Sequence, residues 1–416
     1  MDIKKYSTII SFLIIIAAVY LSFYSLTPES NVTFNNFSIE RALEHVKKMS
    51  LNPHFTGSPE HKNVRNYLIN ELEKLGLEVE IQEQVAINKK WRAATKVKNI
   101  IAKIPGTERG KSLVLLSHYD SNPHSSLGAS DAASGVAIIL EGITSFLKTK
   151  KQSKNDIIIC FTDAEELGLL GANAFVNHHR WAKNVGLVLN FEARGSGGPS
   201  YMFVETNGGN KNLINAFNEA NTPYPVANSL MYSIYKLLPN DTDLTVFREN
   251  GNNNGFNFAF IGDHFDYHTQ QDTFERMDLQ SFNHQVSYFL ATFNYFSNAN
   301  LNNLDSASNL VYFNFPYFGL ITYPYSWVYP LIFIGLISFL LLLCWGLFKK
   351  EITLKGIFNG FIPLTIAFII SIIFAVFGWK LIKLMHPQYN DILHGFTYNG
   401  YYYIGAFTAI TVAICF

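Results

Sequence analysis

Residues 112–120 read SLVLLSHYD, a run of apolar residues that leads directly into His118 and Asp120. A short apolar run that is bounded by polar residues is typical of a strand buried in a sheet. Similar β-rich runs lie along the chain at residues 77–84, 97–104, 156–162, 186–192, 201–205 and 256–262. Segments with helical spacing lie between or beside them, at residues 38–49, 59–75, 133–147, 166–176, 211–220 and 279–297. Strands that alternate with helices predict an α/β fold, with a twisted and mostly parallel sheet between helices.

Imidazoles and carboxylates follow several of the predicted strands at their carboxyl ends. In parallel sheets this is the edge at which ligands bind. The residues concerned are His118, Asp120, Glu165, Glu166, Glu192 and His268, together with Asp131 at the start of a predicted helix. Singly, each is explained as a helix cap or a turn residue. Capping and turn formation do not explain why the same placement occurs on several strands. In addition, two adjacent carboxylates in an apolar context repel each other unless a cation or a proton compensates their charge. The pattern therefore predicts a metal site at this edge.

The composition indicates that part of the chain lies in lipid. Hydrophobic residues make up 48% of the 416 residues and charged residues only 15%. Nearly uncharged runs cover residues 7–26, 327–348, 357–381 and 401–416. We expect a transmembrane anchor in residues 1–30, a globular domain in residues 31–310 and a membrane region in residues 311–416. That last region has about three spans of the length that crosses a bilayer, and it is apparently truncated because the final run is still apolar at its end.

Lysines flank two of these runs and predict the orientation of the chain. Lys4 and Lys5 precede the first run, and Lys349 and Lys350 follow the second. Because basic residues concentrate on the cytoplasmic side, the domain between the runs is expected on the extracytoplasmic side, in a periplasm or an organelle lumen. The formal net charge is +0, which argues against nucleic acid as a partner, since phosphate binding needs a basic excess.

The dispersed polar motifs resemble those of the M28 family of zinc exopeptidases, especially its membrane-anchored branch of vacuolar and endoplasmic-reticulum membrane aminopeptidases. The resemblance covers about residues 38–297. The motifs that carry it are His118-x-Asp120, Gly128-Ala-Ser-Asp131-x-x-Ser-Gly135, Asp163-x-Glu165-Glu166-x-Gly168, Glu192 and Tyr267-His268-Thr-x-x-Asp272. They stand in the order that the family shows, and they imply the fold of a zinc exopeptidase.

The resemblance implies a role for each of these residues and two zinc ions per chain. His118 and Glu192 would hold one Zn²⁺, Glu166 and His268 the other, and Asp131 would bridge both. Glu165 would be the general base. Asp120 would accept a hydrogen bond from His118. Some members of the family have Asp where this chain has Glu192, and either carboxylate can bind zinc.

Elementary chemistry agrees with these roles. Zinc takes imidazole nitrogen and carboxylate oxygen, and a catalytic site keeps a position open. A bridging ligand needs two donor atoms on the same side chain, which Asp131 offers and a histidine does not. A ligated carboxylate is a poor proton carrier, so Glu165 is expected to accept the proton of the attacking water without binding metal itself.

Several other polar side chains are candidates for contact with a substrate. His124 follows the first motif, and Tyr232 or Tyr235 could stabilise a tetrahedral oxyanion, a choice that the sequence leaves open. Arg194 stands beside Glu192 and is expected to pair with an acid. His264 shares a loop with His268 and is expected to shape it.

The function expected from these observations is a membrane-anchored aminopeptidase that removes N-terminal residues from peptides. One alternative is a zinc transferase like the glutaminyl cyclases, which resemble the same family and use one zinc. Another is an inactive receptor domain on a peptidase fold, although this chain keeps all five ligands and the base. There is no Gly-x-Ser-x-Gly and no His-Glu-x-x-His, which argues against serine hydrolases and thermolysin-type proteases.

Overall fold

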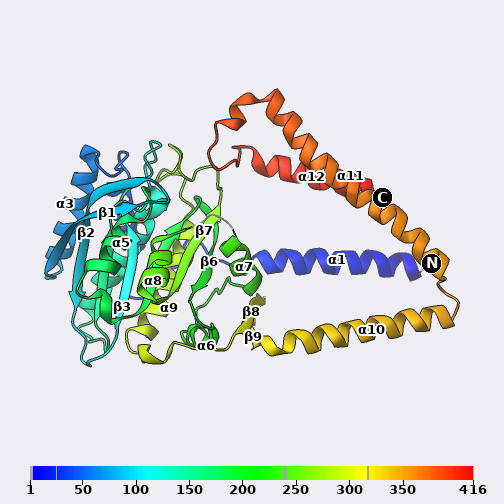
Figure 1. Cartoon of the computed structure of the whole chain (residues 1–416), viewed down its shortest axis with the longest axis horizontal. Helices are drawn as coiled ribbons and strands as arrows, with labels where there is room; N and C mark the ends of the chain where they lie inside the picture. Colours follow the sequence, from blue (N-terminus) through cyan, green and yellow to red (C-terminus); the bar gives the residue numbers. More distant parts are fainter. Residues whose placement is uncertain (1–2, 25, 238–240, 316–317, 416) are drawn as a thin grey trace. The chain divides into compact units, whose positions relative to one another are not determined.

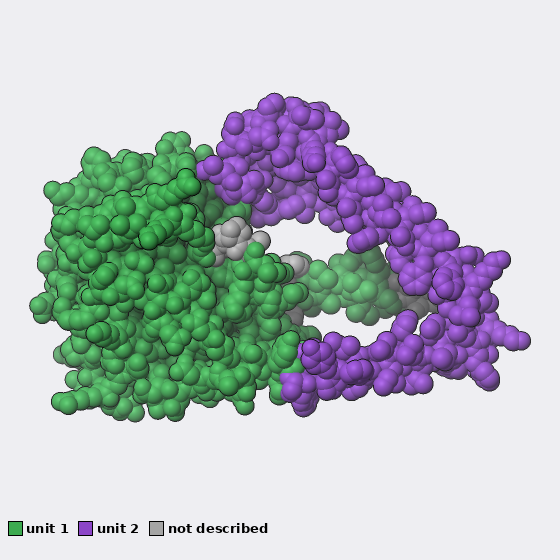
Figure 2. All heavy atoms as spheres, in the orientation of Figure 1, with its two compact units in different colours: residues 1–325 green, residues 326–416 purple. Residues whose placement is uncertain are grey.

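The computed structural model describes residues 3–24, 26–237, 241–315 and 318–415. The chain divides into two compact units, Met1–Tyr325 and Ser326–Phe416 (Figure 2). The first unit includes residues 311–325, which the hydropathy pattern assigns to the membrane region. The boundaries at residues 30 and 310 stay predictions.

A seven-stranded sheet carries the fold of the first unit (Figure 1). Its order is β1-β2-β4-β3-β5-β7-β6. The strands are β1 (Val79–Asn88), β2 (Ala93–Ile104), β3 (Ser112–His118), β4 (Ile157–Thr162), β5 (Val185–Ala193), β6 (Gly197–Glu205) and β7 (Asn254–Gly262). The neighbours β4, β3, β5 and β7 run parallel, whereas β1, β2 and β6 join antiparallel at the edges. The predicted α/β fold with a mostly parallel central sheet is confirmed.

Both faces of the parallel strands are buried, as their continuous apolar sequence predicts. Along β3, Leu113 and Leu115 belong to the larger core cluster, and Val114 and Leu116 belong to a second cluster. Because successive side chains of a strand point to opposite faces, one strand supplies two cores. The helices at Gly135–Lys148 (α4) and Leu279–Phe296 (α9) contribute to the larger cluster. Those at Leu170–His178 (α5) and Asp243–Gly251 (α8) contribute to the second.

Helices connect the strands and cover the sheet (Figure 1). Those of the globular part are α2 (Ile39–Met49), α3 (Pro59–Lys74), α4 (Gly135–Lys148), α5 (Leu170–His178), α6 (Lys211–Glu219), α7 (Ser229–Leu237), α8 (Asp243–Gly251) and α9 (Leu279–Phe296). A π-helical turn, η1 (Ala129–Ser134), precedes α4. The side chains of Ser38, Ser58 and Asp278 accept backbone N–H groups at the starts of α2, α3 and α9, which explains where these helices begin.

Three features differ from what the sequence pattern predicts. The helix expected from residue 166 begins only at Leu170, because Ala164 (φ 58°) and Leu169 (φ 60°) adopt left-handed backbone that a helix cannot include. Helices α7 and α8 lie in a stretch without a predicted element. A two-stranded hairpin, β8 (Leu310–Phe315) and β9 (Gly319–Pro324), precedes the second apolar run.

The apolar runs form helices α1 (Ile3–Tyr24), α10 (Val328–Phe348), α11 (Leu354–Met385) and α12 (Gly400–Cys415). By length and composition, three helices within the described residues could cross a membrane: Ala129–Lys148, Tyr325–Phe348 and Leu354–Met385. The first is 83% buried inside the protein and is therefore a core helix, whereas the other two are 0% buried. Shorter apolar helices cover Ile9–Ser22 and Gly400–Cys415.

Candidate metal centre

The parallel strands bring the predicted site residues to one edge of the sheet. His118 is the last residue of β3, and Glu192 lies one residue before the end of β5. Glu166 lies in the loop after β4, and His268 lies in the loop after β7. Asp131 lies in η1, in front of α4. These five residues are spread over 150 positions of the sequence, from His118 to His268. They come together because the carboxyl ends of parallel strands meet at one edge of the sheet.

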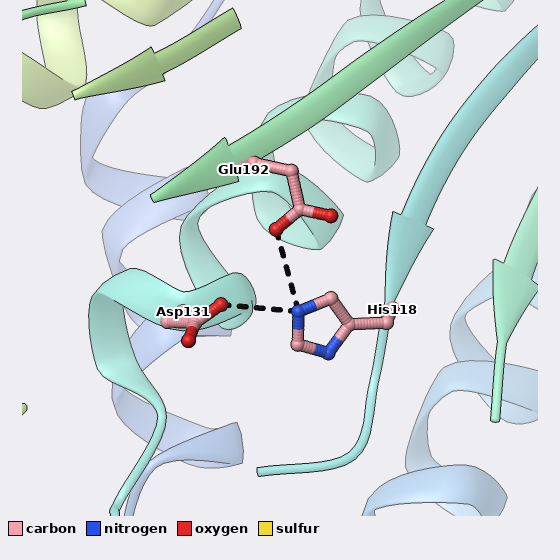
Figure 3. A group of neighbouring side chains, drawn as sticks. All are labelled: His118, Asp131 and Glu192. Carbon is pink, nitrogen blue, oxygen red and sulfur yellow. Dashed lines mark hydrogen bonds and ion pairs between the residues drawn. The ribbon is translucent and has the colours of Figure 1, made fainter. Parts of the chain in front are cut away.

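His118, Asp131 and Glu192 form a first group of donor atoms (Figure 3). The Nε2 atom of His118 is 3.0 Å from Oδ1 of Asp131 and 3.4 Å from Oε2 of Glu192. All three residues are buried. One ligand atom from each lies within 4.8 Å of the others, which is a separation that a single bound ion allows.

Asp131, Glu166 and His268 form a second group. The Nε2 atom of His268 is 3.0 Å from Oε2 of Glu166 and 3.3 Å from Oδ2 of Asp131. Asp131 therefore directs Oδ1 toward one imidazole and Oδ2 toward the other. The structure thus brings all five predicted ligands together, with the residue that is expected to bridge lying between the two groups. Their roles as ligands stay predictions.

The backbone around Asp131 is fixed by close packing and by a second carboxylate. Gly128 has φ 64°, and a Cβ atom there would lie 2.9 Å from the carbonyl oxygen of Asp131, so a glycine is needed. The Asp272 carboxylate accepts the N–H groups of Ser130 (2.7 Å) and Asp131 (3.2 Å). Sequence reasoning gave Asp272 a place in a motif but no role, and the structure shows that it orients the start of η1.

Asp120 holds the loop that carries the adjacent glutamates. Its Oδ1 atom accepts the N–H of Glu165 at 3.1 Å, and its Oδ2 atom accepts the N–H of Glu166 at 3.3 Å. Nδ1 of His118 lies 2.9 Å from the backbone carbonyl oxygen of Asp120 and 3.6 Å from its carboxylate. The main-chain oxygen is thus the nearer acceptor for His118, and the carboxylate that was expected to orient this ring also positions Glu165 and Glu166.

Glu165 lies within reach of the ligands. One of its oxygens, a nitrogen of His118 and an oxygen of Glu166 lie within 4.8 Å of one another. Distance alone therefore does not separate Glu165 from the ligand residues.

Asn122 also positions Glu166, because its Nδ2 donates to Oε2 of Glu166 at 2.8 Å while its Oδ1 contacts Nδ1 of His124 at 2.7 Å. His124 is thus linked to the site through Asn122.

The other substrate-contact candidates occupy different surroundings. The hydroxyl of Tyr235 donates to Glu205 at 3.4 Å. Arg194 lies over the ring of Tyr267, 5.1 Å from its centroid, and that ring stacks on His268 with a centroid distance of 3.6 Å. Sequence reasoning did not single out Tyr267 as a side chain of the site. Its contact with His268 makes it a wall of the second donor group.

Mutual electrostatic effects among these buried groups are strong. Burial disfavours a protonated His268, but the carboxylates of Glu166 and Asp131 outweigh this and raise its pKa to about 9. For His118 the same balance between burial and the carboxylates, above all Glu192, raises the pKa well above its ordinary value. Burial raises the pKa of Glu166 and of Glu192 despite the attraction of the histidines. The carboxylates therefore favour a positive charge between them, whether on a protonated imidazole or on a cation.

Comparison with protein families identifies the domain that contains this centre. Residues 99–293 match the family model described as peptidase family M28. This part of the chain is an M28 peptidase domain. The resemblance drawn from the dispersed motifs is thereby confirmed.

Relatives of this M28 domain are membrane proteases. The vacuolar membrane protease of Candida dubliniensis is 29% identical over 328 residues, which are 75% of this chain and 34% of the relative. Human endoplasmic reticulum metallopeptidase 1 is 26% identical over 305 residues, which are 68% of this chain and 33% of the relative. The chain thus spans about a third of the length of these two relatives.

A solved structure shares the fold. A glutaminyl cyclase from Porphyromonas gingivalis superposes with a TM-score of 0.52 at 21% sequence identity, and the match covers 63% of this chain and 99% of that one. At this identity the likeness concerns the fold alone.

The donor set of the M28 domain fits a metal ion. It combines two imidazoles with carboxylates, which is the ligand chemistry of zinc. The Oε1 atom of Glu166 is buried and lacks a hydrogen-bond partner within the described part of the chain. A buried carboxylate oxygen without a partner is costly unless a cation or a proton satisfies it. The residues present therefore fit a bound cation.

Proposed function

We propose that the M28 domain is a zinc-dependent peptidase that removes N-terminal residues from peptides. The observation that carries this proposal is the geometry of Asp131, whose two oxygens face the two imidazoles of His118 and His268 at 3.0 and 3.3 Å. A carboxylate between two donor groups can offer one oxygen to each of two metal ions, which suits a two-metal site.

The charge of the centre supports two ions. Asp131, Glu165, Glu166 and Glu192 would together carry four negative charges when ionised, and two divalent cations would balance them. His118 and Glu192 would hold one Zn²⁺, Glu166 and His268 the other, and Asp131 both. When bound, the zinc ions would polarise the scissile carbonyl and lower the pKa of the attacking water.

Glu165 is the proposed general base. Burial raises its pKa well above the ordinary value, and the carboxylates of Glu166 and Glu192 add to the effect against the opposing charge of His118. A raised pKa means that the Glu165 carboxylate holds a proton more readily than an ordinary glutamate does, as a general base requires. The Glu165 carboxylate would accept the proton of the water and pass it to the leaving amine. Asp120 would hold the Glu165 backbone in place while the proton moves.

The proposed location follows from the flanking lysines and from the relatives. Basic residues stand at the far ends of both helices that flank the domain: Lys4 and Lys5 before it, and Lys349 and Lys350 after it. They favour a cytoplasmic position for these helix ends. The M28 domain would then face a periplasm or an organelle lumen. The names of the vacuolar and endoplasmic-reticulum relatives agree with a membrane setting of this kind.

The experiment that tests the function uses the full chain in lipid vesicles. We expect hydrolysis of aminoacyl chromophores and of peptides with a free N-terminus, loss of turnover after chelation, and recovery with Zn²⁺. Peptides with an acetylated N-terminus are the matched control for exopeptidase action and should not be cleaved. Formation of pyroglutamyl product from N-terminal glutamine, without hydrolysis, would indicate a cyclase instead.

Glu165→Gln isolates the role of the base. The substitution keeps the size of the side chain but removes its ability to accept the proton, so turnover should fall by about 10²–10⁴-fold. Zinc content, measured on the same sample by atomic emission, should stay near that of the wild type. Unchanged turnover would refute the assignment of Glu165, and a loss of zinc would make Glu165 a ligand instead.

A further inference from the structure

Helix α7 presents an apolar face to the outside of the protein. Leu230, Ile234 and Leu237 are 69%, 48% and 86% exposed, and their spacing of four and three residues places them on one side of the helix. The opposite side packs on the domain, where the ring of Tyr235 stacks on Phe203 at 4.9 Å. A surface helix of a soluble domain normally has the reverse orientation, with its apolar stripe toward the core.

The β8–β9 hairpin, which contacts α7, also exposes apolar side chains. Phe315, Phe318 and Ile321 are 47%, 77% and 36% exposed. A hydrogen bond joins the hairpin to the first residue of α7, since the backbone N–H of Tyr312 donates to the side-chain hydroxyl of Ser229 at 2.9 Å. We call the exposed side chains of both elements the α7–hairpin face: Leu230, Ile234, Leu237, Phe315, Phe318 and Ile321.

Charge is almost absent from this surface. No charged residue occurs between Asp305 and Lys349, a stretch that contains the whole hairpin and the helix that follows it. Lys236 is the only charged residue of α7. Contiguous apolar surface of this kind on a folded domain marks a site that another partner or a membrane covers.

The chain itself indicates what covers the face. Pro324, the last residue of β9, is followed directly by the candidate span Tyr325–Phe348. From Pro324 to the first residue of α10, Val328, the chain advances by four residues, and four residues of backbone reach at most about 14 Å. The hairpin therefore cannot lie far from the level at which α10 would enter the hydrocarbon. Tyr325, Trp327 and Tyr329 are 53%, 57% and 64% exposed at this junction. Tyr and Trp are enriched at the boundary between lipid and water.

We propose that the α7–hairpin face lies in the interfacial layer of the same bilayer that α10 crosses. Helices that lie in this layer bury their apolar side about 5–10 Å into the boundary between headgroups and acyl chains, and they carry basic rather than acidic residues on the polar side. Helix α7 meets both conditions, with three exposed apolar side chains and a single lysine. The inference does not depend on the catalytic activity of the domain.

Fluorophores placed on the face test this proposal in the full chain. Ile234→Cys and Phe318→Cys each carry a polarity-sensitive label in phosphatidylcholine vesicles. The vesicles hold a lipid with a spin-label quencher near its headgroup, and iodide is added to the water as a second quencher. We expect the labels at 234 and 318 to lose emission to the lipid quencher and to be shielded from iodide.

Val85→Cys is the matched control, because Val85 is an apolar residue that is 61% exposed on β1, at the other edge of the sheet from β6. Its label should respond to iodide and not to the lipid quencher. The exposed thiols of Cys344 and Cys415 are replaced by Ser in all variants, while the buried Cys160 is kept. Unchanged thermal midpoints would show that the labelled chains are folded.

Two outcomes would overturn the proposal. If the labels at 234 and 318 respond to iodide as the label at 85 does, the face is in water. If they are shielded from both quenchers, protein covers the face, and either a second copy or another part of the chain is its partner. Two positions on separate elements keep the test valid if one label disturbs its own element.

Discussion

At the candidate metal centre, carboxylates and imidazoles lie inside the protein, whereas at the α7–hairpin face, aliphatic and aromatic side chains lie outside it. Both arrangements are opposite to the usual distribution of residues in a folded domain. Asp131 is 5% exposed, while Leu237 is 86% exposed. A charged group that is buried away from water needs an opposite charge close to it. An apolar side chain that is exposed outside the core is stabilised by an apolar neighbour. We therefore propose that a cation completes the first region and that lipid covers the second.

Among the substitutions that test this comparison, Asp131→Asn is expected to lower turnover the most. An amide offers one oxygen instead of two and carries no negative charge, so it cannot serve both donor groups. Loss of metal assistance removes several kcal/mol of transition-state stabilisation, which corresponds to a fall in turnover on the order of 10³-fold or more. Zinc per chain, measured by atomic emission, should fall together with turnover. Full zinc content would contradict a bridging role.

Asp120→Asn is the control for this substitution, because it leaves the five proposed ligands in place. Its amide nitrogen would face one of the N–H groups of Glu165 and Glu166, which the carboxylate now accepts at 3.1 and 3.3 Å. We expect a fall of about 10–100-fold in turnover, as is typical of residues that orient a metal site. Zinc content should change less than in Asp131→Asn.

The two regions also differ in how well the sequence predicts them. The metal centre follows from polar residues at the ends of apolar strands, because parallel strands place their carboxyl ends at one edge whatever the details of packing. The loop conformation at Glu165 and Glu166 does not follow from local sequence. It depends on the carboxylate of Asp120, a residue that follows β3 and accepts the N–H groups of both glutamates. The left-handed backbone of Leu169 then delays the predicted helix, which begins at Leu170.

The α7–hairpin face was missed for a different reason. A hydropathy pattern assigns residues 311–324 to the membrane region, since an exposed apolar hairpin and a lipid-facing segment have the same composition. The pairing of β8 with β9 and the hydrogen bond between Tyr312 and Ser229 show that the segment is part of the domain.

A smaller effect concerns His284 of α9, which joins β6 to the segment between α6 and α7. Its Nε2 donates to the carbonyl of Tyr224 at 2.7 Å, and its Nδ1 accepts the N–H of Ser200 at 3.0 Å. A proton on Nδ1 would face that N–H, and burial lowers the pKa of His284 to about 4. The folded value lies below the unfolded value, so this contribution to stability is fully present above about pH 6.5 and is lost as the pH falls toward 4.

Denaturant unfolding between pH 4 and 7.5 measures this contribution, with chelator present so that metal release does not interfere. A difference of about 2.5 pKa units corresponds to a loss of about 3 kcal/mol in the free energy of unfolding at the acid end. His284→Gln can keep one donor and one acceptor but cannot be protonated, so its unfolding free energy should decline less steeply. Equal slopes in the wild type and the variant would show that His284 does not titrate on unfolding.

The smallest effect is expected at the exposed face, and it separates lipid contact from protein contact. Ile234→Ser removes an apolar side chain that is 48% exposed, from a helix position where Ser and Ile have similar propensity. If only lipid contacts Ile234, the free energy of unfolding in detergent solution should change by no more than about 0.5 kcal/mol. Ile138→Ser in α4 is the matched control, because Ile138 is fully buried and should lose about 3 kcal/mol or more. A loss at Ile234 as large as that at Ile138 would mean that protein covers this side chain in the native state, and the proposed lipid contact of the α7–hairpin face would then be wrong.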